Sequence, residues 1–111
     1  MPPMNQEEMK RRLGLMHAAY LAKAPEKISH VEALWLTVRN GGPGDSTPEE
    51  LVLAVHTLAG SAPTLGCEAL GVAARELEIA LRNVFAGEGT LSSVDKAKID
   101  RLVERLPRSL A

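Results

Sequence analysis

The chain has 111 residues, of which 13 are Lys or Arg and 14 are Asp or Glu, giving a formal net charge of -1. This balance excludes a strong net attraction to nucleic acid or to an anionic membrane surface. Hydrophobic residues make up 45% of the chain but aromatic residues only 3%, so aliphatic side chains that helices accept must form the core. We therefore predict a single all-α domain over residues 1–111 whose partners are proteins.

The lone cysteine and the N-terminus bear on the cellular setting. Cys67 cannot form an internal disulfide and lacks the clustered ligands of a zinc site, so we interpret it as a small hydrophobic residue buried at a helix start. The N-terminal segment is charged where a signal peptide is apolar, and no apolar run reaches the roughly 20 residues that span a bilayer. The sequence predicts a cytoplasmic protein without membrane insertion, bound metal or cofactor.

Two predicted helices lie on either side of Pro25. Residues 5–22 form the first, with four apolar side chains on one face: Met9, Leu13, Met16 and Tyr20. Pro25 suits the first turn of the second, where its missing N–H would be unpaired anyway. The second helix continues to Asn40, where a glycine-rich stretch stops it, and its apolar stripe contains Ile28, Val31, Trp35 and Val38.

A third helix begins at Thr47-Pro48-Glu49-Glu50 and extends to about Leu65. Thr47 is the expected N-cap, Pro48 suits the first helical position, and Glu50 can close a capping box.

Gly66 separates the third helix from a fourth, which ends near Gly87 and Gly89. Ser92 or Ser93 can cap a last helix, Val94 to Leu106, before Pro107. Short connections force neighbouring helices to run antiparallel. We therefore predict an antiparallel up-down four-helix bundle, with the first helix as an additional N-terminal helix packed across one end, and a monomer.

His56 lies on the outer face of the third predicted helix. At 100° per residue, the opposite face holds the core stripe of Leu51, Ala54, Val55, Leu58, Ala62 and Leu65. The neighbours of His56 on its own face carry no charge: Val52, Leu53, Ala59, Gly60 and Pro63. Because solvated helix faces normally expose charged side chains, this apolar surface around one imidazole predicts a docking site.

Gly60 lies one turn after His56 on the same face. Glycine inside a helix lowers the helix stability by up to about 1 kcal/mol relative to alanine, so its presence here needs an explanation. We interpret Gly60 as removing a side chain that would crowd the imidazole, which lets a reacting group approach closely. With a pKa of about 6.5, an imidazole offers a neutral nucleophilic nitrogen at cytoplasmic pH.

Residues 54–70, AVHTLAGSAPTLGCEAL, closely resemble the phosphorylation motif of histidine-containing phosphotransfer (Hpt) domains. The family pattern reads His-x-Leu-Lys-Gly-Ser, followed by Leu-Gly. The resemblance implies that His56 is the phosphoacceptor and that Gly60 and Ser61 are the glycine and small polar residue of the motif. It extends more weakly from Leu15 to Asn83.

The resemblance implies a phosphorelay intermediate of a two-component system. The phospho-aspartate of a receiver domain, in a hybrid sensor histidine kinase or a response regulator, would pass its phosphoryl group to His56, which would pass it to another receiver. The chain would be a phosphocarrier protein without its own ATP site rather than an enzyme. Magnesium would be held by the receiver.

One departure from the family pattern is Ala59, where Hpt domains usually carry lysine. The loss of this cation predicts weaker phosphohistidine stabilisation or a replacement from elsewhere. Antiparallel pairing about Gly66 would bring residues 75–79 beside His56. We name Arg75 as the substitute cation, with Arg82 as a further possibility, and the imidazole could donate a hydrogen bond to Glu78 or Glu76.

Ala59 also keeps open a different class of function, a degenerate Hpt-like adaptor that binds a receiver or another signalling protein without phosphorylation. An enzyme has less support, because the sequence contains no glycine-rich phosphate loop, nucleophile elbow or His-Glu-x-x-His motif. The other two histidines lack the context of His56. We expect His30 to be solvated and His17 to flank the apolar stripe of the first helix.

Overall fold

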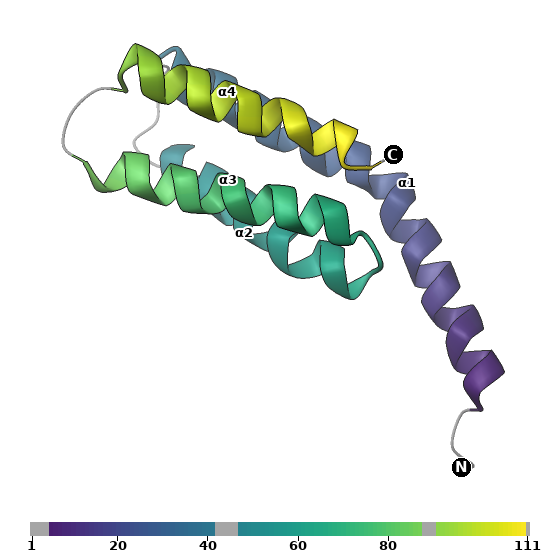
Figure 1. Ribbon diagram of the computed structural model, residues 1–111. Helices are drawn as coiled ribbons and strands as arrows, with labels where there is room; N and C mark the ends of the chain where they lie inside the picture. The colour runs from purple at the N-terminus through teal and green to yellow at the C-terminus, as the bar shows by residue number, and fades with distance from the viewer. Residues whose placement is uncertain (1–4, 42–46, 88–90, 111) are drawn as a thin grey trace.

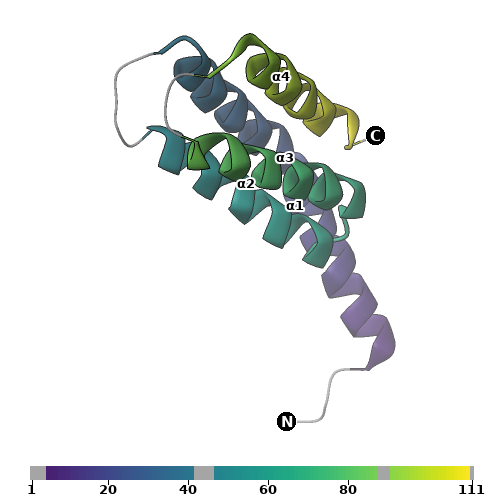
Figure 2. The same ribbon diagram turned by 60° about the vertical axis from the view of Figure 1, so that its left-hand side comes forward.

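A computed structural model describes residues 5–41, 47–87 and 91–110, and within these ranges the protein is all-α. Its helices are α1 (Gln6–Arg39), α2 (Thr47–Thr64), α3 (Glu68–Ala86) and α4 (Ser93–Arg108). They form a bundle in cyclic order, since each packs on the next and α4 packs on α1 (Figure 1; Figure 2). In Figure 1 the colour gradient runs in opposite directions along α2 and α3. The prediction of an all-helical bundle is confirmed.

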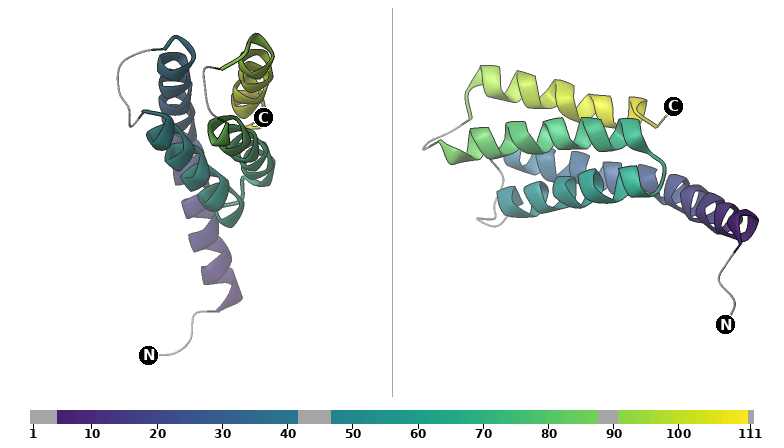
Figure 3. Two further views of the ribbon diagram at one scale, coloured as in Figure 1. Left: turned by 90° about the vertical axis from the view of Figure 1, so that its left-hand side faces the viewer. Right: turned by 60° about the horizontal axis from the view of Figure 1, so that its bottom comes forward.

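The prediction of a separate N-terminal helix packed across one end is wrong. One helix of 34 residues, α1, replaces the first two predicted helices and continues through Pro25. Proline costs a backbone hydrogen bond, but a single line of buried side chains crosses it without a change of phase: Tyr20, Ala24, Ile28, Val31 and Trp35. Burial on both sides thus keeps the helix continuous. Its N-terminal part extends beyond the bundle (Figure 3), and we call residues 6–16, none of which is buried, the arm.

The remaining helix ends agree closely with the sequence signals. Helix α2 has Thr47 as its first helical residue rather than its N-cap. At the start of α4, Ser92 is the N-cap and forms a capping box with Asp95. Helix α4 continues two residues past its predicted end, because the backbone N–H of Ser109 bonds back to Arg105 and closes the turn around Pro107. The predicted role of Gly89 lies outside the described residues.

The core consists mainly of aliphatic side chains from all four helices, together with two buried aromatic residues that have polar partners. The Tyr20 hydroxyl hydrogen-bonds to Oγ of Ser61 at 2.8 Å, which links α1 to α2. Trp35 donates from Nε1 to Oδ1 of Asp100 at 2.8 Å, which links α1 to α4. Cys67 is buried at the start of α3, as predicted. None of the described helices has the length and apolar character needed to cross a membrane.

The turn between α2 and α3 brings the two helices close together. Gly66 adopts a φ of 88°, a left-handed conformation that favours glycine. A Cβ atom on Gly71 would lie 2.4 Å from Cγ of Pro63, so the proline ring of α2 rests directly on the backbone of α3. His17 of α1 donates from Nδ1 to the carbonyl oxygen of Leu65 at 2.8 Å and fastens the base of the arm to this turn.

Candidate functional site

The middle of α2 presents His56 to solvent, because the helix buries its opposite face. Leu51, Val55, Leu58 and Ala62 are buried in the core. The His56 side chain is 62% exposed, and it lies on the edge of α2 that packs against α3.

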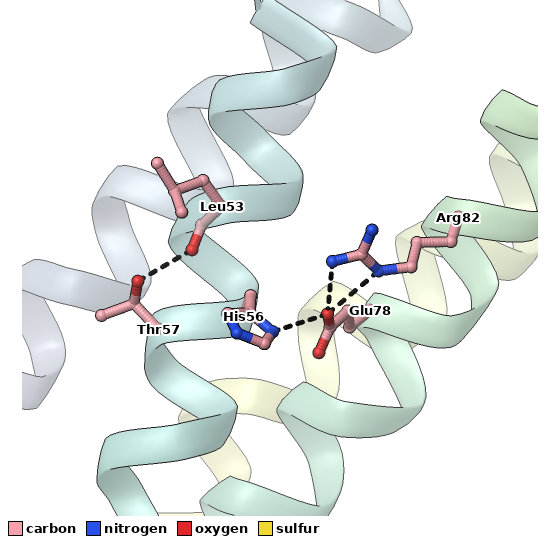
Figure 4. A network of polar contacts seen from close by, with 5 residues as sticks. All are labelled: Leu53, His56, Thr57, Glu78 and Arg82. Atoms are coloured by element: carbon pink, nitrogen blue, oxygen red, sulfur yellow. Dashed lines mark hydrogen bonds and ion pairs between the residues drawn. The ribbon is translucent and has the colours of Figure 1, made fainter.

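The imidazole is joined to two side chains of α3 (Figure 4). Nδ1 of His56 lies 2.8 Å from Oε2 of Glu78, whose side chain is only 11% exposed. Arg82, one turn further along α3, donates to the same oxygen from Nε at 3.0 Å and from Nη2 at 2.8 Å. One nearly buried carboxylate oxygen therefore links a histidine to an arginine.

The charge state of Glu78 determines which nitrogen of His56 carries hydrogen. Burial acts to raise the pKa of Glu78, but the hydrogen bonds and positive charges of Arg82 and His56 outweigh it, so the pKa is lowered. An ionised carboxylate can only accept hydrogen bonds. Nδ1 must therefore carry the hydrogen, and in the neutral ring the lone pair lies on Nε2.

A shallow pocket between α2 and α3 surrounds this histidine. Its lining is mostly apolar, with the imidazole and the Arg82 guanidinium among few polar groups: Pro48, Glu49, Val52, Leu53, His56, Arg82, Phe85 and Ala86. A molecule docked there would meet a nucleophilic nitrogen, a cation and the Glu49 carboxylate within an otherwise apolar setting.

A family model for the Hpt domain matches residues 15–109. The chain belongs to the Hpt family. No curated protein and no solved structure gives a significant match. Hpt domains are phosphocarrier modules without an ATP site of their own, so membership gives this chain a phosphotransfer-type role in phosphorelay.

Of the two arginines considered for this Hpt domain, only Arg82 contacts the His56–Glu78 pair. Arg75 is exposed on α3 and forms no hydrogen bond or ion pair with the described residues. Glu76 pairs instead with Arg105 of α4, so Glu78 is the carboxylate brought to His56. The structure thus brings Glu78 to His56 and Arg82 to Glu78, whereas Glu76 and Arg75 do not join this network.

The predicted motif residues of this Hpt domain lie around His56 in different environments. Ser61 bonds to Tyr20, so its hydroxyl links two helices. Ala59 is half-buried and packs against the core. A methyl group on Gly60 would meet no atom of the chain within 4 Å. The interpretation that Gly60 keeps a larger side chain away from the imidazole, so that a reacting group can approach closely, stays a prediction. Any need for glycine at this position would come from a docked partner.

The three residues predicted to form the docking surface differ in exposure. Leu53 is exposed and Val52 is half-buried, and both line the pocket beside His56. Pro63 is exposed on one side, while its ring contacts Gly71 on the other. The other histidines lie elsewhere on α1, with His30 exposed, as expected, and His17 bonded to Leu65. The partner of His17 is 48 residues away in sequence, and no local pattern indicates it.

Proposed function

We propose that this Hpt domain accepts a phosphoryl group on Nε2 of His56 from the phospho-aspartate of a receiver domain and passes it to another receiver. The observation that carries the proposal is the hydrogen bond between Nδ1 and Glu78, because it leaves the nucleophilic lone pair on Nε2. The exposed imidazole beside an apolar pocket supports docking of a second protein over that nitrogen.

In the accepting step, Nε2 attacks phosphorus and the N–P bond forms while the P–O bond to aspartate breaks. Aspartate leaves as a carboxylate, and the ring becomes positively charged with its Nδ1–H facing ionised Glu78. In the donating step a neutral imidazole leaves, so no proton has to enter or leave the ring. The magnesium that such transfer uses would belong to the receiver, and this chain supplies no cofactor of its own.

Arg82 is the proposed substitute for the lysine that Ala59 replaces. Its guanidinium lines the same pocket as His56 and is 58% exposed, so it can approach an incoming phosphoryl group while remaining paired with Glu78. Arginine suits this task because it keeps its charge at every relevant pH and offers several donors.

The proposed setting is a cytoplasmic, monomeric phosphocarrier between a hybrid sensor histidine kinase and a response regulator. Membership of the Hpt family supports these partners. The cyclic packing of the four helices supports a monomer, since each helix covers part of its neighbours' apolar faces.

The test is phosphate incorporation from a panel of phosphorylated receiver domains into wild type, His56→Gln and His30→Gln. We expect acid-labile, base-stable labelling of wild type and His30→Gln and none of His56→Gln, with helicity unchanged in all three by circular dichroism. His30 is the matched control because it is another exposed helix histidine. Receiver binding without labelling of wild type would instead assign the adaptor function.

A further inference from the structure

The arm of α1 carries an apolar face that no described part of the chain covers. Met9, Leu13 and Met16 follow one another at four- and three-residue intervals, so they lie on one side of the helix. They are 50%, 53% and 51% exposed. The family match begins at residue 15, so most of the arm lies outside the phosphotransfer module.

The same face of α1 becomes basic where the helix joins the bundle. At 100° per residue, Lys23 and Lys27 fall in line with the three apolar residues of the arm. Both lysines and Met16 line a groove between α1 and α2, together with Thr57 and Ser61. We call this line of five residues the α1 track: Met9, Leu13, Met16, Lys23 and Lys27.

The charges along the α1 track determine what can bind there. No acidic side chain is among the residues lining the groove, and neither lysine forms an ion pair within the described ranges. The arm itself is close to neutral, since Glu7 and Glu8 accompany Lys10, Arg11 and Arg12 and Arg12 pairs with Glu8. An acidic partner would meet the positive charges of Lys23 and Lys27 in the groove, whereas a second copy in parallel packing would bring these lysines against each other.

We propose that the α1 track binds an amphipathic helix of a partner protein, with apolar side chains against the arm and acidic side chains against Lys23 and Lys27. Anchors spaced by three and four residues are what one helix presents to another. The two methionines suit such a contact because their unbranched side chains adapt to different surfaces. This surface is separate from the pocket beside His56, and the proposal does not depend on phosphotransfer.

The experiment measures binding of a fluorescent synthetic peptide of about 20 residues, long enough to follow α1 from Met9 to Lys27 at about 1.5 Å per residue. The peptide is an amphipathic helix with leucine on one face and glutamate on the rest. We expect wild type to bind it, with affinity falling as salt rises. Binding should weaken about tenfold in Lys23→Glu/Lys27→Glu and in Met9→Gln/Leu13→Gln/Met16→Gln.

The control variants change two lysines on another helix or the histidine beside the pocket. Lys96→Glu/Lys98→Glu on α4 and His56→Gln should bind the acidic peptide as wild type does, and circular dichroism should show unchanged helicity in every variant. Equal binding of a peptide with lysine in place of glutamate, or unchanged binding by both track variants, would overturn the proposal. So would preferential binding of wild type to phosphatidylserine vesicles, or a dimer in sedimentation that Leu13→Gln abolishes.

Discussion

The two ring nitrogens of His56 have different surroundings because Glu78 contacts only one of them. Nδ1 faces a carboxylate that is almost removed from solvent, while the ring as a whole remains exposed. Arg82 keeps that carboxylate ionised, although it does not contact the imidazole itself. The reactivity of one nitrogen is therefore set by two side chains acting on the other.

Replacing Arg82 with alanine should slow phosphoryl transfer to His56 about tenfold. Removing a fully buried charge-stabilising group would slow it more, but the Arg82 guanidinium is well exposed to solvent, which weakens its effect. Arg75→Ala is the matched control on the same helix and should transfer at the wild-type rate. Adding Ala59→Lys to Arg82→Ala should recover part of the loss. Rapid-quench kinetics with one receiver as donor measure all four proteins, and equal slowing by both arginine variants would exclude a specific role for Arg82.

The free energy of unfolding should fall as the pH drops below about 4.5. The pKa of Glu78 is lowered by folding from its ordinary value of 4.5, so its stabilisation is complete above that value and is lost as the pH falls through the folded pKa. Glu78→Gln should show a smaller loss over the same range. Urea unfolding of both proteins from about pH 7 to about pH 3 measures the difference, and parallel curves would contradict the assigned charge state.

About half of this site could be predicted from the sequence. The motif identified His56, and pairing about the Gly66 turn placed Glu78 within the right range of α3. The same pairing favours Arg75 as the cation, because it indicates only the residues directly opposite His56. Arg82 lies one turn beyond that range and reaches back to Glu78 across a four-residue interval, a contact that depends on side-chain direction.

At the scale of the helices, glycine and capping signals predicted α2, α3 and α4 closely, whereas the proline signals were misleading. The sequence predicts helix boundaries at Pro25 and Pro107, yet both residues lie inside helices. A proline removes one hydrogen bond locally, while the apolar stripe on both sides of it gains burial over many residues. Whether the stripes stay in phase across a proline depends on what packs against them, and a single sequence does not contain that information.

The close approach of α2 and α3 predicts opposite outcomes for two glycines. Gly71→Ala should lower the free energy of unfolding by about 1–3 kcal/mol, because its methyl group would overlap the rigid ring of Pro63. Gly60→Ala should raise it by up to about 1 kcal/mol, since the new methyl group meets open space inside a helix. Urea denaturation measures both, and a stabilised Gly71→Ala would show that the two helices can separate at little cost.

At the scale of the whole molecule, the bundle is closed by Asp100 of α4. Its carboxylate accepts hydrogen bonds from Trp35 and from Nε of Arg39, both on α1. Asp100→Ala should lower the free energy of unfolding by about 1–3 kcal/mol, because the buried Trp35 N–H loses its acceptor. Glu76→Ala, which breaks an exposed ion pair between α3 and α4, should cost no more than about 1 kcal/mol. If Asp100→Ala and Glu76→Ala lowered the free energy of unfolding equally in thermal or urea denaturation, the role of Asp100 in joining α4 to α1 would be contradicted.

The continuity of α1 through Pro25 also fixes a distance. A helix of 34 residues is about 51 Å long at about 1.5 Å per residue, and it is one continuous helix rather than two segments joined by a loop. A protein held at the arm would therefore sit at a set spacing and bearing from a protein docked over His56. Two partners could then exchange a phosphoryl group while both are bound only if their dimensions match that spacing, and partners that cannot span it would be excluded.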